Sequence, residues 1–334
     1  MKMVQTPGTA LLLLQLLLLA CAIEPCFSWI QSGTSSYLAS KSNVPQNVHL
    51  LILPGFGNES ADYILEQAPV GSLTRSLQKR GWKDEQIRVL PLKRTDWLQV
   101  FLRGAVSLDF WRNQAPPAVA FGWYLDRVAE QVKDLVATDK DAKIVLVCHS
   151  AGGWLARAAL GFGSASYVSD KKETPSFCID LDRIIGMVTL GAPHEPPPPQ
   201  VMDMTRGALR ITHSEFPGAF HTPRLFYVTV IGNAVAGVKR EGNEKNTVAG
   251  FAYNSYEAVC GDGTTVGDGV VPVCAGHLKG ANQINLEGVL HSINAPDNWY
   301  GSDSIIDSWH DTMLDQIQKM TYFDAGPPLE RFFR

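Results

Sequence analysis

The sequence predicts an α/β protein whose mostly parallel central sheet carries helices on both faces. After residue 46, short apolar runs rich in β-branched residues alternate with longer amphipathic stretches, as parallel strands alternate with crossover helices. The run 143–147 is almost wholly apolar, which is typical of a strand covered on both faces. Two stretches, 94–117 and 194–223, break the alternation, and we expect them to be lid-like insertions above a site.

Strands are expected where short apolar runs stop at turn-forming or small residues. The first run ends at Pro54, and the run at 143–147 leads into a turn of small residues around Ser150. The expected strands are, in chain order, 48–53, 86–90, 143–147, 184–190, 225–231 and 283–286.

Helices are expected where apolar residues recur at helical spacing. The stretches 61–80 and 123–137 show this amphipathic pattern, and 151–160 is rich in alanine, which favours helix most strongly. The stretch 304–320 is expected to close the domain as a last helix. The folded domain then spans 47–322 and leaves 323–334 as a flexible tail.

The N-terminus has the three parts of a secretory signal: a basic start, a leucine-rich centre and a small-residue exit at Ala20-Cys21-Ala22. We expect a signal peptide at 1–22, and the alternative is an uncleaved membrane anchor. Residues 29–47 contain six Ser or Thr, one Lys and no acid, so 23–46 is either a linker or a transit-like presequence. The signal peptide predicts entry into the secretory pathway. The transit-like alternative would direct the protein to a secondary plastid, and otherwise the destination is the endoplasmic reticulum lumen or the cell exterior.

Composition and charge exclude several classes of function. The 334-residue chain has a net charge of −4 and only 19% charged residues, so it lacks the basic face that nucleic acids require. No block of lysine and arginine is present that would hold the protein on an anionic membrane, which leaves transient contact with a membrane surface. We predict no nucleic-acid partner, and the sequence does not indicate an oligomeric state.

The cysteines show no metal-binding pattern. Four of the six lie beyond the presequence, at Cys148, Cys178, Cys260 and Cys274, and none belongs to a Cys-x-x-Cys pair or has zinc spacing. We therefore predict no metal site. Cys260 and Cys274 bracket a short loop and can pair in an oxidising compartment, and two free thiols are the alternative.

The most informative motif surrounds Ser150. A buried strand runs through Cys148-His149-Ser150-Ala151-Gly152 into a helix, which is the strand–turn–helix context of a nucleophile elbow. Such a turn tolerates only small residues two places to either side of the nucleophile. Gly152 meets this demand, and Cys148 is a small residue where the motif usually has glycine. The alternative is a serine that only caps the helix.

A second motif follows the first expected strand, at Pro54-Gly55-Phe56-Gly57. In folds with a nucleophile elbow, the loop after this strand supplies one backbone N–H of the oxyanion hole, and the residue after the nucleophile supplies the other. We therefore predict the backbone N–H groups of Phe56 and Ala151 as the oxyanion donors.

The acid that would orient the catalytic histidine is predicted to be Asp268. It lies between two glycines and ahead of an apolar run, in Gly267-Asp268-Gly269-Val270-Val271. A tight turn of this kind can present a carboxylate to an imidazole. Asp262, in Gly261-Asp262-Gly263, is the rival candidate, and both Asp-Gly steps can also be simple turns.

The general base is predicted to be His291, because it follows the last expected strand. A histidine that takes a proton from serine needs a carboxylate partner on one ring nitrogen and must present the other nitrogen to the nucleophile. His277 is the most credible rival, and His310 comes next. His149 adjoins the nucleophile, but we expect its ring to face away.

These motifs together resemble the lipase/esterase branch of the α/β-hydrolase superfamily over residues 47–320. Their chain order, Ser150 then Asp268 then His291, is the order of that superfamily. Residues 189–194 resemble the Leu-Gly-x-Pro-His segment of many lipases. The closest likeness is to a plant, algal and cyanobacterial group of lipase-like proteins, some described as GPI inositol-deacylase-like (PGAP-like). The resemblance implies an α/β-hydrolase fold at 47–322 and ester hydrolysis without a cofactor.

The expected function is that of a serine hydrolase of the esterase/lipase type (EC 3.1), which cleaves carboxylic esters through an acyl-enzyme. Aromatic residues in and near the insertions, namely Trp97, Trp111 and Trp154, suggest a lipophilic acyl substrate. Each of them can equally complete the core. Two other functions remain open from sequence: an acyltransferase with the same triad, and a catalytically inactive binding module.

Overall fold

The computed structural model describes residues 44–64, 72–164, 167, 177–240, 247–295 and 297–324. These residues belong to one compact unit, Lys41–Arg334. The predicted signal peptide, nearly all of the predicted presequence and most of the predicted tail lie outside the described residues. No helix in the described part of the chain is long and apolar enough to cross a membrane.

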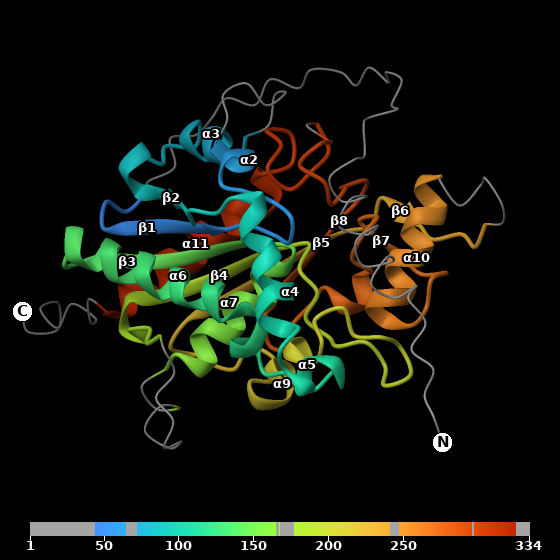
Figure 1. Ribbon diagram of the computed structural model, residues 1–334. Coiled ribbons are helices and arrows are strands. Elements are labelled where there is room, and N and C mark those ends of the chain that lie inside the picture. Colours follow the sequence, from blue (N-terminus) through green and yellow to red (C-terminus); the bar gives the residue numbers. More distant parts are fainter. Residues whose placement is uncertain are drawn as a thin grey trace, which may run out of the picture. The chain divides into compact units, whose positions relative to one another are not determined.

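A sheet of six parallel strands forms the centre of the molecule (Figure 1). The strands run in the order β2-β1-β3-β4-β5-β8, and every neighbouring pair is parallel. The predicted fold class is confirmed, and each of the six strands lies where the sequence placed it, within two residues. The strand bounds are β1 Val48–Leu53, β2 Ile87–Val89, β3 Lys143–His149, β4 Ile184–Leu190, β5 Phe226–Gly232 and β8 Asn282–Leu286.

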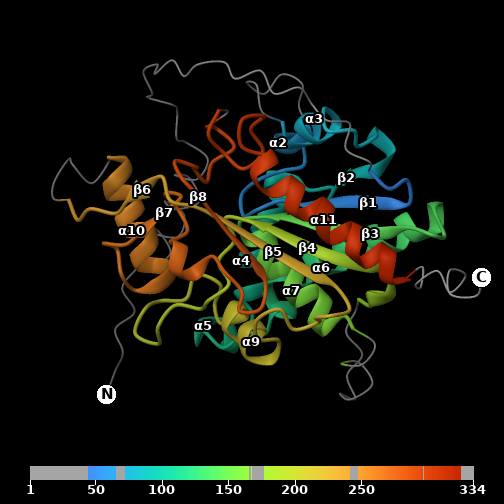
Figure 2. The same cartoon turned by 180° about the vertical axis from the view of Figure 1, so that it is seen from behind.

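Both faces of the sheet are covered, as Figures 1 and 2 show from opposite sides. Successive side chains of a strand point to opposite faces. Leu51 and Leu146 therefore belong to one apolar cluster with α6 (Pro117–Thr138) and α7 (Ala151–Phe162), whereas Leu50 and Val145 belong to another with α11 (Asp307–Asp324). The two apolar clusters explain why the inner strands are apolar on both faces.

All four predicted helices have different bounds in the structure, and α7 differs least, since it ends at Phe162. The predicted helix 61–80 is wrong as a single element: the structure has α2 (Ala61–Ile64) and a separate helix, α3 (Leu73–Gln78). Helix α3 begins after Ser72, whose side chain accepts a hydrogen bond from the Arg75 N–H at 3.5 Å. Pro69 and Gly71, both helix breakers, lie between the two. Helix α6 begins earlier than predicted, because Pro117 suits the first helical position. Helix α11 extends past the predicted end into the segment that we assigned to the tail.

The two insertions carry short helices, which lie on the front of the molecule in Figure 1. The first contains α4 (Leu98–Gly104) and α5 (Leu108–Trp111), and the second contains α9 (Ala208–Glu215). A third addition that the sequence did not predict follows β5. It consists of α10 (Val248–Cys260) and a two-stranded antiparallel pair, β6 (Val235–Ala236) with β7 (Val266–Gly267).

Candidate active site

The turn between β3 and α7 holds Ser150 in a strained backbone conformation. Its φ is 52° and its ψ is −128°, a region that L-residues other than glycine seldom occupy. Gly152 lets the start of α7 approach the end of β1, because a Cβ at this position would lie 2.4 Å from the Leu53 carbonyl oxygen. Cys148 fits at the usual glycine position, fully buried, and burial raises the pKa of its thiol. The local geometry is that of a nucleophile elbow.

Ser150, His291 and Asp268 form a continuous hydrogen-bonded line. The His291 Nε2 atom lies 2.9 Å from Ser150 Oγ, and its Nδ1 atom lies 2.7 Å from Asp268 Oδ2. The three residues come from the ends of separate segments: the β3–α7 turn, the loop after β7 and the loop after β8. Asp268 and His291 are both buried. This arrangement allows the carboxylate to hold the imidazole while the imidazole faces the serine hydroxyl.

Asp268 is held by hydrogen bonds on both of its carboxylate oxygens. Oδ1 accepts from the backbone N–H of Val271 at 2.7 Å and of Val270 at 3.0 Å. Oδ2 accepts from the Tyr300 hydroxyl at 2.7 Å, in addition to its contact with His291. Three neutral donors therefore fix the direction of the carboxylate. Sequence reasoning missed Tyr300, since nothing in its local sequence separates it from a core tyrosine.

The loop after β1 lies directly against the serine turn. A Cβ on Gly55 would lie 2.6 Å from Ser150 Cβ, so this position requires glycine. The ring of the next residue, Phe56, packs on Trp97 with ring centroids 4.9 Å apart. Among the described residues, the backbone N–H groups of Phe56 and Ala151 have no protein acceptor. Both are thus available to an external oxygen, as the oxyanion prediction requires.

Comparison with known proteins is decisive for the family. Residues 45–318 match the sequence profile of the Alpha/beta hydrolase family. This chain belongs to the alpha/beta hydrolase family. Among curated proteins, none matches this hydrolase in sequence. The narrower resemblance to the plant, algal and cyanobacterial group stays a prediction.

Solved structures share the fold of this hydrolase at low sequence identity. Staphylococcus hyicus lipase is 12% identical over 86% of this chain and 100% of its own, with a TM-score of 0.50. The Bacillus licheniformis lipase BlEst2 is 14% identical over 84% of this chain and 96% of its own, with a TM-score of 0.45. The metagenomic carboxyl esterase MGS0156 is 13% identical over 89% of this chain and 82% of its own, with a TM-score of 0.46. At such identities the likeness concerns the fold alone.

A second hydrogen-bond chain joins the loop after β1, which holds Gly55, to the loop after β8, which holds His291. The Gly55 N–H donates to the Tyr63 hydroxyl at 3.2 Å, and this hydroxyl contacts His149 Nδ1 at 2.8 Å. On its other edge, His149 Nε2 lies 3.0 Å from the backbone carbonyl of His291. Burial, with the neighbouring His291, lowers the pKa of His149 to about 3, so its ring is neutral and can donate from one nitrogen and accept at the other.

His149 was expected to face away from the site, and its ring does lie outside the line of Ser150, His291 and Asp268. The ring nevertheless packs beside His291, with centroids 4.9 Å apart. We missed its positioning contacts, and those of Tyr63, because they depend on loops far apart in the sequence.

The rival acid and base are occupied elsewhere. The Asp262 carboxylate accepts from the Thr264 N–H at 2.8 Å within its own turn, and bonds from Thr264 lower its pKa. His277 lies between Thr229 at 2.8 Å and Asn285 at 3.1 Å. Neither rival contacts Ser150 or His291 in the described residues.

The three tryptophans predicted to bind substrate lie in different environments. Trp97 and Trp154 are buried, with Trp154 edge-on to Phe121 at a centroid distance of 4.9 Å. Both complete the core in this conformation. Trp111 is 55% exposed and lies on the first insertion.

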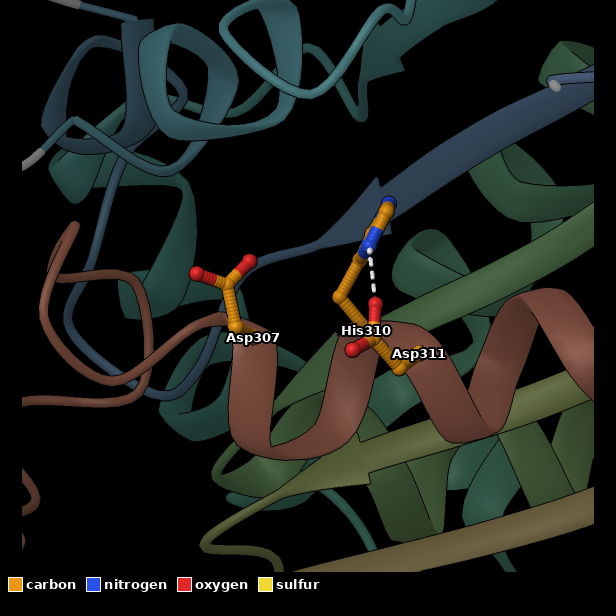
Figure 3. A group of neighbouring side chains, drawn as sticks. All are labelled: Asp307, His310 and Asp311. Carbon is orange, nitrogen blue, oxygen red and sulfur yellow. Dashed lines mark ion pairs between the residues drawn. The ribbon is translucent and has the colours of Figure 1, made fainter. Parts of the chain in front are cut away.

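The structure contains one group of side chains with the spacing of metal ligands among its described residues: Asp307, His310 and Asp311 of α11 (Figure 3). Their ligand atoms lie within 4.8 Å of one another. His310 is buried, and its Nε2 accepts a hydrogen bond from the Trp82 indole N–H at 2.9 Å, so this lone pair is already used. His310 Nδ1 lies 3.7 Å from the exposed Asp311 carboxylate.

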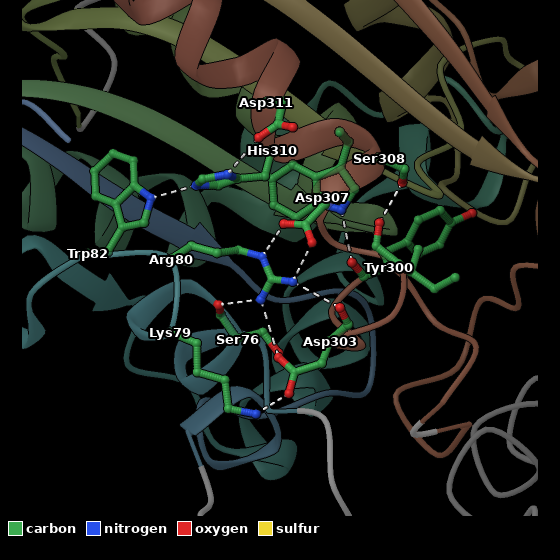
Figure 4. Close-up of polar contacts among 12 residues, drawn as sticks. Ser76, Lys79, Arg80, Trp82, Tyr300, Asp303, Asp307, Ser308, His310 and Asp311 are labelled. Atoms are coloured by element: carbon green, nitrogen blue, oxygen red, sulfur yellow. Dashed lines mark hydrogen bonds and ion pairs between the residues drawn. The ribbon is translucent and has the colours of Figure 1, made fainter. Parts of the chain in front are cut away.

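A guanidinium occupies the place beside this group where a cation would bind (Figure 4). Arg80, next to α3, ion-pairs with Asp307 and with Asp303, and its NH1 donates to the Ser76 carbonyl at 2.9 Å. Lys79 pairs with the same Asp303. We call these contacts, between the end of α3 and the start of α11, the α3–α11 latch. The positive charge of Arg80 opposes a metal ion there.

Proposed function

We propose that this alpha/beta hydrolase is a serine hydrolase that cleaves carboxylic esters of lipophilic acyl groups through an acyl-enzyme. The observation that carries the proposal is the line from Ser150 through His291 to Asp268, with contacts of 2.9 and 2.7 Å. A serine hydroxyl is a weak nucleophile until a neighbouring base takes its proton, and the geometry supplies such a base.

The reaction follows from these contacts. His291 takes the proton of Ser150 as the oxygen attacks the ester carbonyl, and Asp268 stabilises the resulting imidazolium. The backbone N–H groups of Phe56 and Ala151 hold the negative oxygen. His291 then gives its proton to the departing alcohol, and water, activated by the same histidine, releases the acid. Losing one oxyanion donor in such a site costs about 3 kcal/mol of transition-state stabilisation.

Support for a lipophilic substrate comes from the first insertion. Five large apolar side chains on this insertion are at least half exposed, an unusual density for a soluble surface. They are Leu98, Leu102, Val106, Leu108 and Trp111. The insertion joins the site through Trp97, which immediately precedes α4 and packs on Phe56 of the oxyanion loop.

The same surface fits transient contact with a lipid aggregate. Arg103 and Arg112 are exposed beside the apolar side chains, so a headgroup phosphate can pair with them while the apolar groups enter the acyl region. Tryptophan favours this interfacial depth, and Trp111 lies at the end of α5. This part of the proposal commits to lipid as the occupant of the face.

A panel of acyl esters of increasing chain length tests the proposal. We expect hydrolysis of esters longer than acetate, and binding to vesicles containing an anionic phospholipid that weakens in the double variant Leu102→Ser/Val106→Ser. The matched control is Val238→Ser, at an exposed valine outside the insertions. Failure to hydrolyse any ester longer than acetate contradicts the lipophilic substrate. Acyl transfer to an added alcohol in preference to water would assign an acyltransferase.

A further inference from the structure

The segment that carries the predicted acid is bracketed by two cysteines. Cys260 is the last residue of α10, and Cys274 lies in the 3-10 turn Val273–Ala275. Asp268 lies between them, in a stretch of fifteen residues from Cys260 to Cys274 inclusive. We call this stretch the acid loop.

The two cysteines of this loop lie on elements that pack together. Helix α10, which ends at Cys260, contacts the 3-10 turn that holds Cys274, and the Cys260 thiol donates to the Asp262 carbonyl at 3.4 Å. Cys274 is exposed and Cys260 is partly exposed, so a dissolved reagent can reach both. The other two cysteines differ: Cys148 is buried under Ser150, and Cys178 lies in another part of the chain.

Helix α10, which ends at Cys260, holds the acid loop through two side chains of its last turns. The Tyr256 hydroxyl accepts from the Gly269 N–H at 2.8 Å and donates to the Val235 carbonyl at 3.0 Å. The Ser255 hydroxyl donates to the Val270 carbonyl at 2.7 Å. These bonds fix the residues on the C-terminal side of Asp268 against α10. A covalent link from Cys260 to Cys274 would join the same two elements beyond them.

We propose that Cys260 and Cys274 form an intramolecular disulfide that closes the acid loop onto α10. The oxidant is a low-molecular-weight disulfide. A Cys260 thiolate attacks one of its sulfurs, which forms a mixed disulfide and releases one thiol. A Cys274 thiolate then attacks the Cys260 sulfur, which forms the internal disulfide and releases the second thiol. One external disulfide is thereby reduced to two thiols for each bond formed.

The disulfide would stabilise the fold by lowering the conformational entropy of the unfolded chain. It would leave the hydrogen bonds of Asp268 intact. A loop of this length is in the range where such a bond raises Tm by roughly 5 °C in a domain of this size. Burial and the nearby Cys260 thiol raise the pKa of Cys274 to about 11, so closure should be faster at higher pH. The disulfide itself does not depend on the proposed ester hydrolysis; only its effect on the catalytic acid rests on that function.

The test uses the purified full chain, first reduced and then incubated with oxidised glutathione. Intact-mass measurement and maleimide labelling count the thiols, and thermal unfolding gives Tm for each state. We expect wild type to lose two maleimide sites and gain roughly 5 °C in Tm. Cys178→Ser is the matched control, and its oxidised form should gain the same. Cys260→Ser and Cys274→Ser should gain nothing, with reduced-state Tm values near that of reduced wild type.

Two results overturn the proposal. One is stable glutathione adducts on Cys260 and Cys274, with no internal bond after excess oxidant. The other is an internal bond that leaves Tm unchanged, which removes the stabilising role. Both readouts are independent of ester hydrolysis, so they separate this proposal from the proposed function.

Discussion

The candidate active site and the start of α11 both combine aspartate with a buried histidine, and of these two only the first has the form of a catalytic site. In the active site, His291 contacts Asp268 at 2.7 Å on one nitrogen and Ser150 at 2.9 Å on the other. At the start of α11, beside the α3–α11 latch, His310 is 3.7 Å from the exposed Asp311 carboxylate, and its other nitrogen accepts from Trp82.

The difference teaches that the residue types alone do not make the site. The carboxylate beside His291 is buried and held by three other donors, so it stays directed at the ring. The free edge of His291 faces a hydroxyl that the backbone holds in a strained turn. The corresponding nitrogen of His310, Nε2, accepts a hydrogen bond from the Trp82 indole N–H, and an indole N–H cannot become a nucleophile. At the start of α11, aspartate and buried histidine therefore contribute to stability and not to catalysis.

The largest effect is expected from the same substitution made at each place. Asp268→Asn should lower kcat/KM for ester hydrolysis about 10⁴-fold, because the amide holds the wrong histidine tautomer. Asp311→Asn should stay within about twofold of wild type, since Asp311 is exposed and outside the site. Steady-state kinetics of both variants checks this. Equal losses in the two would contradict the division of roles.

The latch should show its contribution in stability. Arg80→Met removes pairs with the partly exposed Asp303 and the exposed Asp307, so we expect a loss of about 1 kcal/mol in the free energy of unfolding. Urea unfolding of the full chain measures it, with Arg75→Met on α3 as the control. Added Zn²⁺ or Mg²⁺ should leave the wild-type transition unchanged. A large metal-dependent rise would show that Asp307, His310 and Asp311 bind a cation.

Buried histidines with lowered pKa values lie in both places and also at His194, so acid should destabilise the whole domain. Burial lowers the pKa of His149 to about 3 and also lowers the pKa of His194 and His310. Unfolded histidine has a pKa near 6.5, so below that pH the unfolded state binds more protons.

The free energy of unfolding should be retained above pH ~6.5 and fall as the pH decreases toward about 3. The slope is at most about 1.4 kcal/mol per pH unit for each histidine. Urea unfolding at a series of pH values measures the slope, which should decrease in His310→Gln. Stability that stays constant between pH ~7 and ~5 would contradict the account.

A smaller effect is expected from the chain that joins the oxyanion and base loops. Tyr63→Phe removes the hydroxyl between Gly55 and His149, and we expect kcat to fall about tenfold while KM changes little. Tyr253→Phe is the control, because its hydroxyl contacts only Glu257 at 3.4 Å in the described residues. A rise in KM with unchanged kcat would assign Tyr63 to substrate binding instead.

The sequence predicted those parts of the molecule whose conformation depends on residues close together in the chain. The alternation of apolar runs predicted the sheet, and the strand–turn–helix around Ser150 predicted the strained turn. Position after the last strand was enough to choose His291 over His277. Tyr63 and Tyr300 escaped prediction, because their contacts are made by loops that meet only in the folded state. Trp97 and Trp154 were ambiguous for the same reason: an aromatic side chain fits a core as well as a binding site.

Labelling of the purified full chain with a fluorophosphonate probe tests the central claim most directly. The account predicts that wild type and His310→Asn are labelled, that Ser150→Ala is not, and that His291→Ala is labelled at least about 100-fold more slowly. Labelling of Ser150→Ala at the wild-type rate, or no labelling of folded wild type, would contradict the assignment of Ser150 as a nucleophile activated by His291.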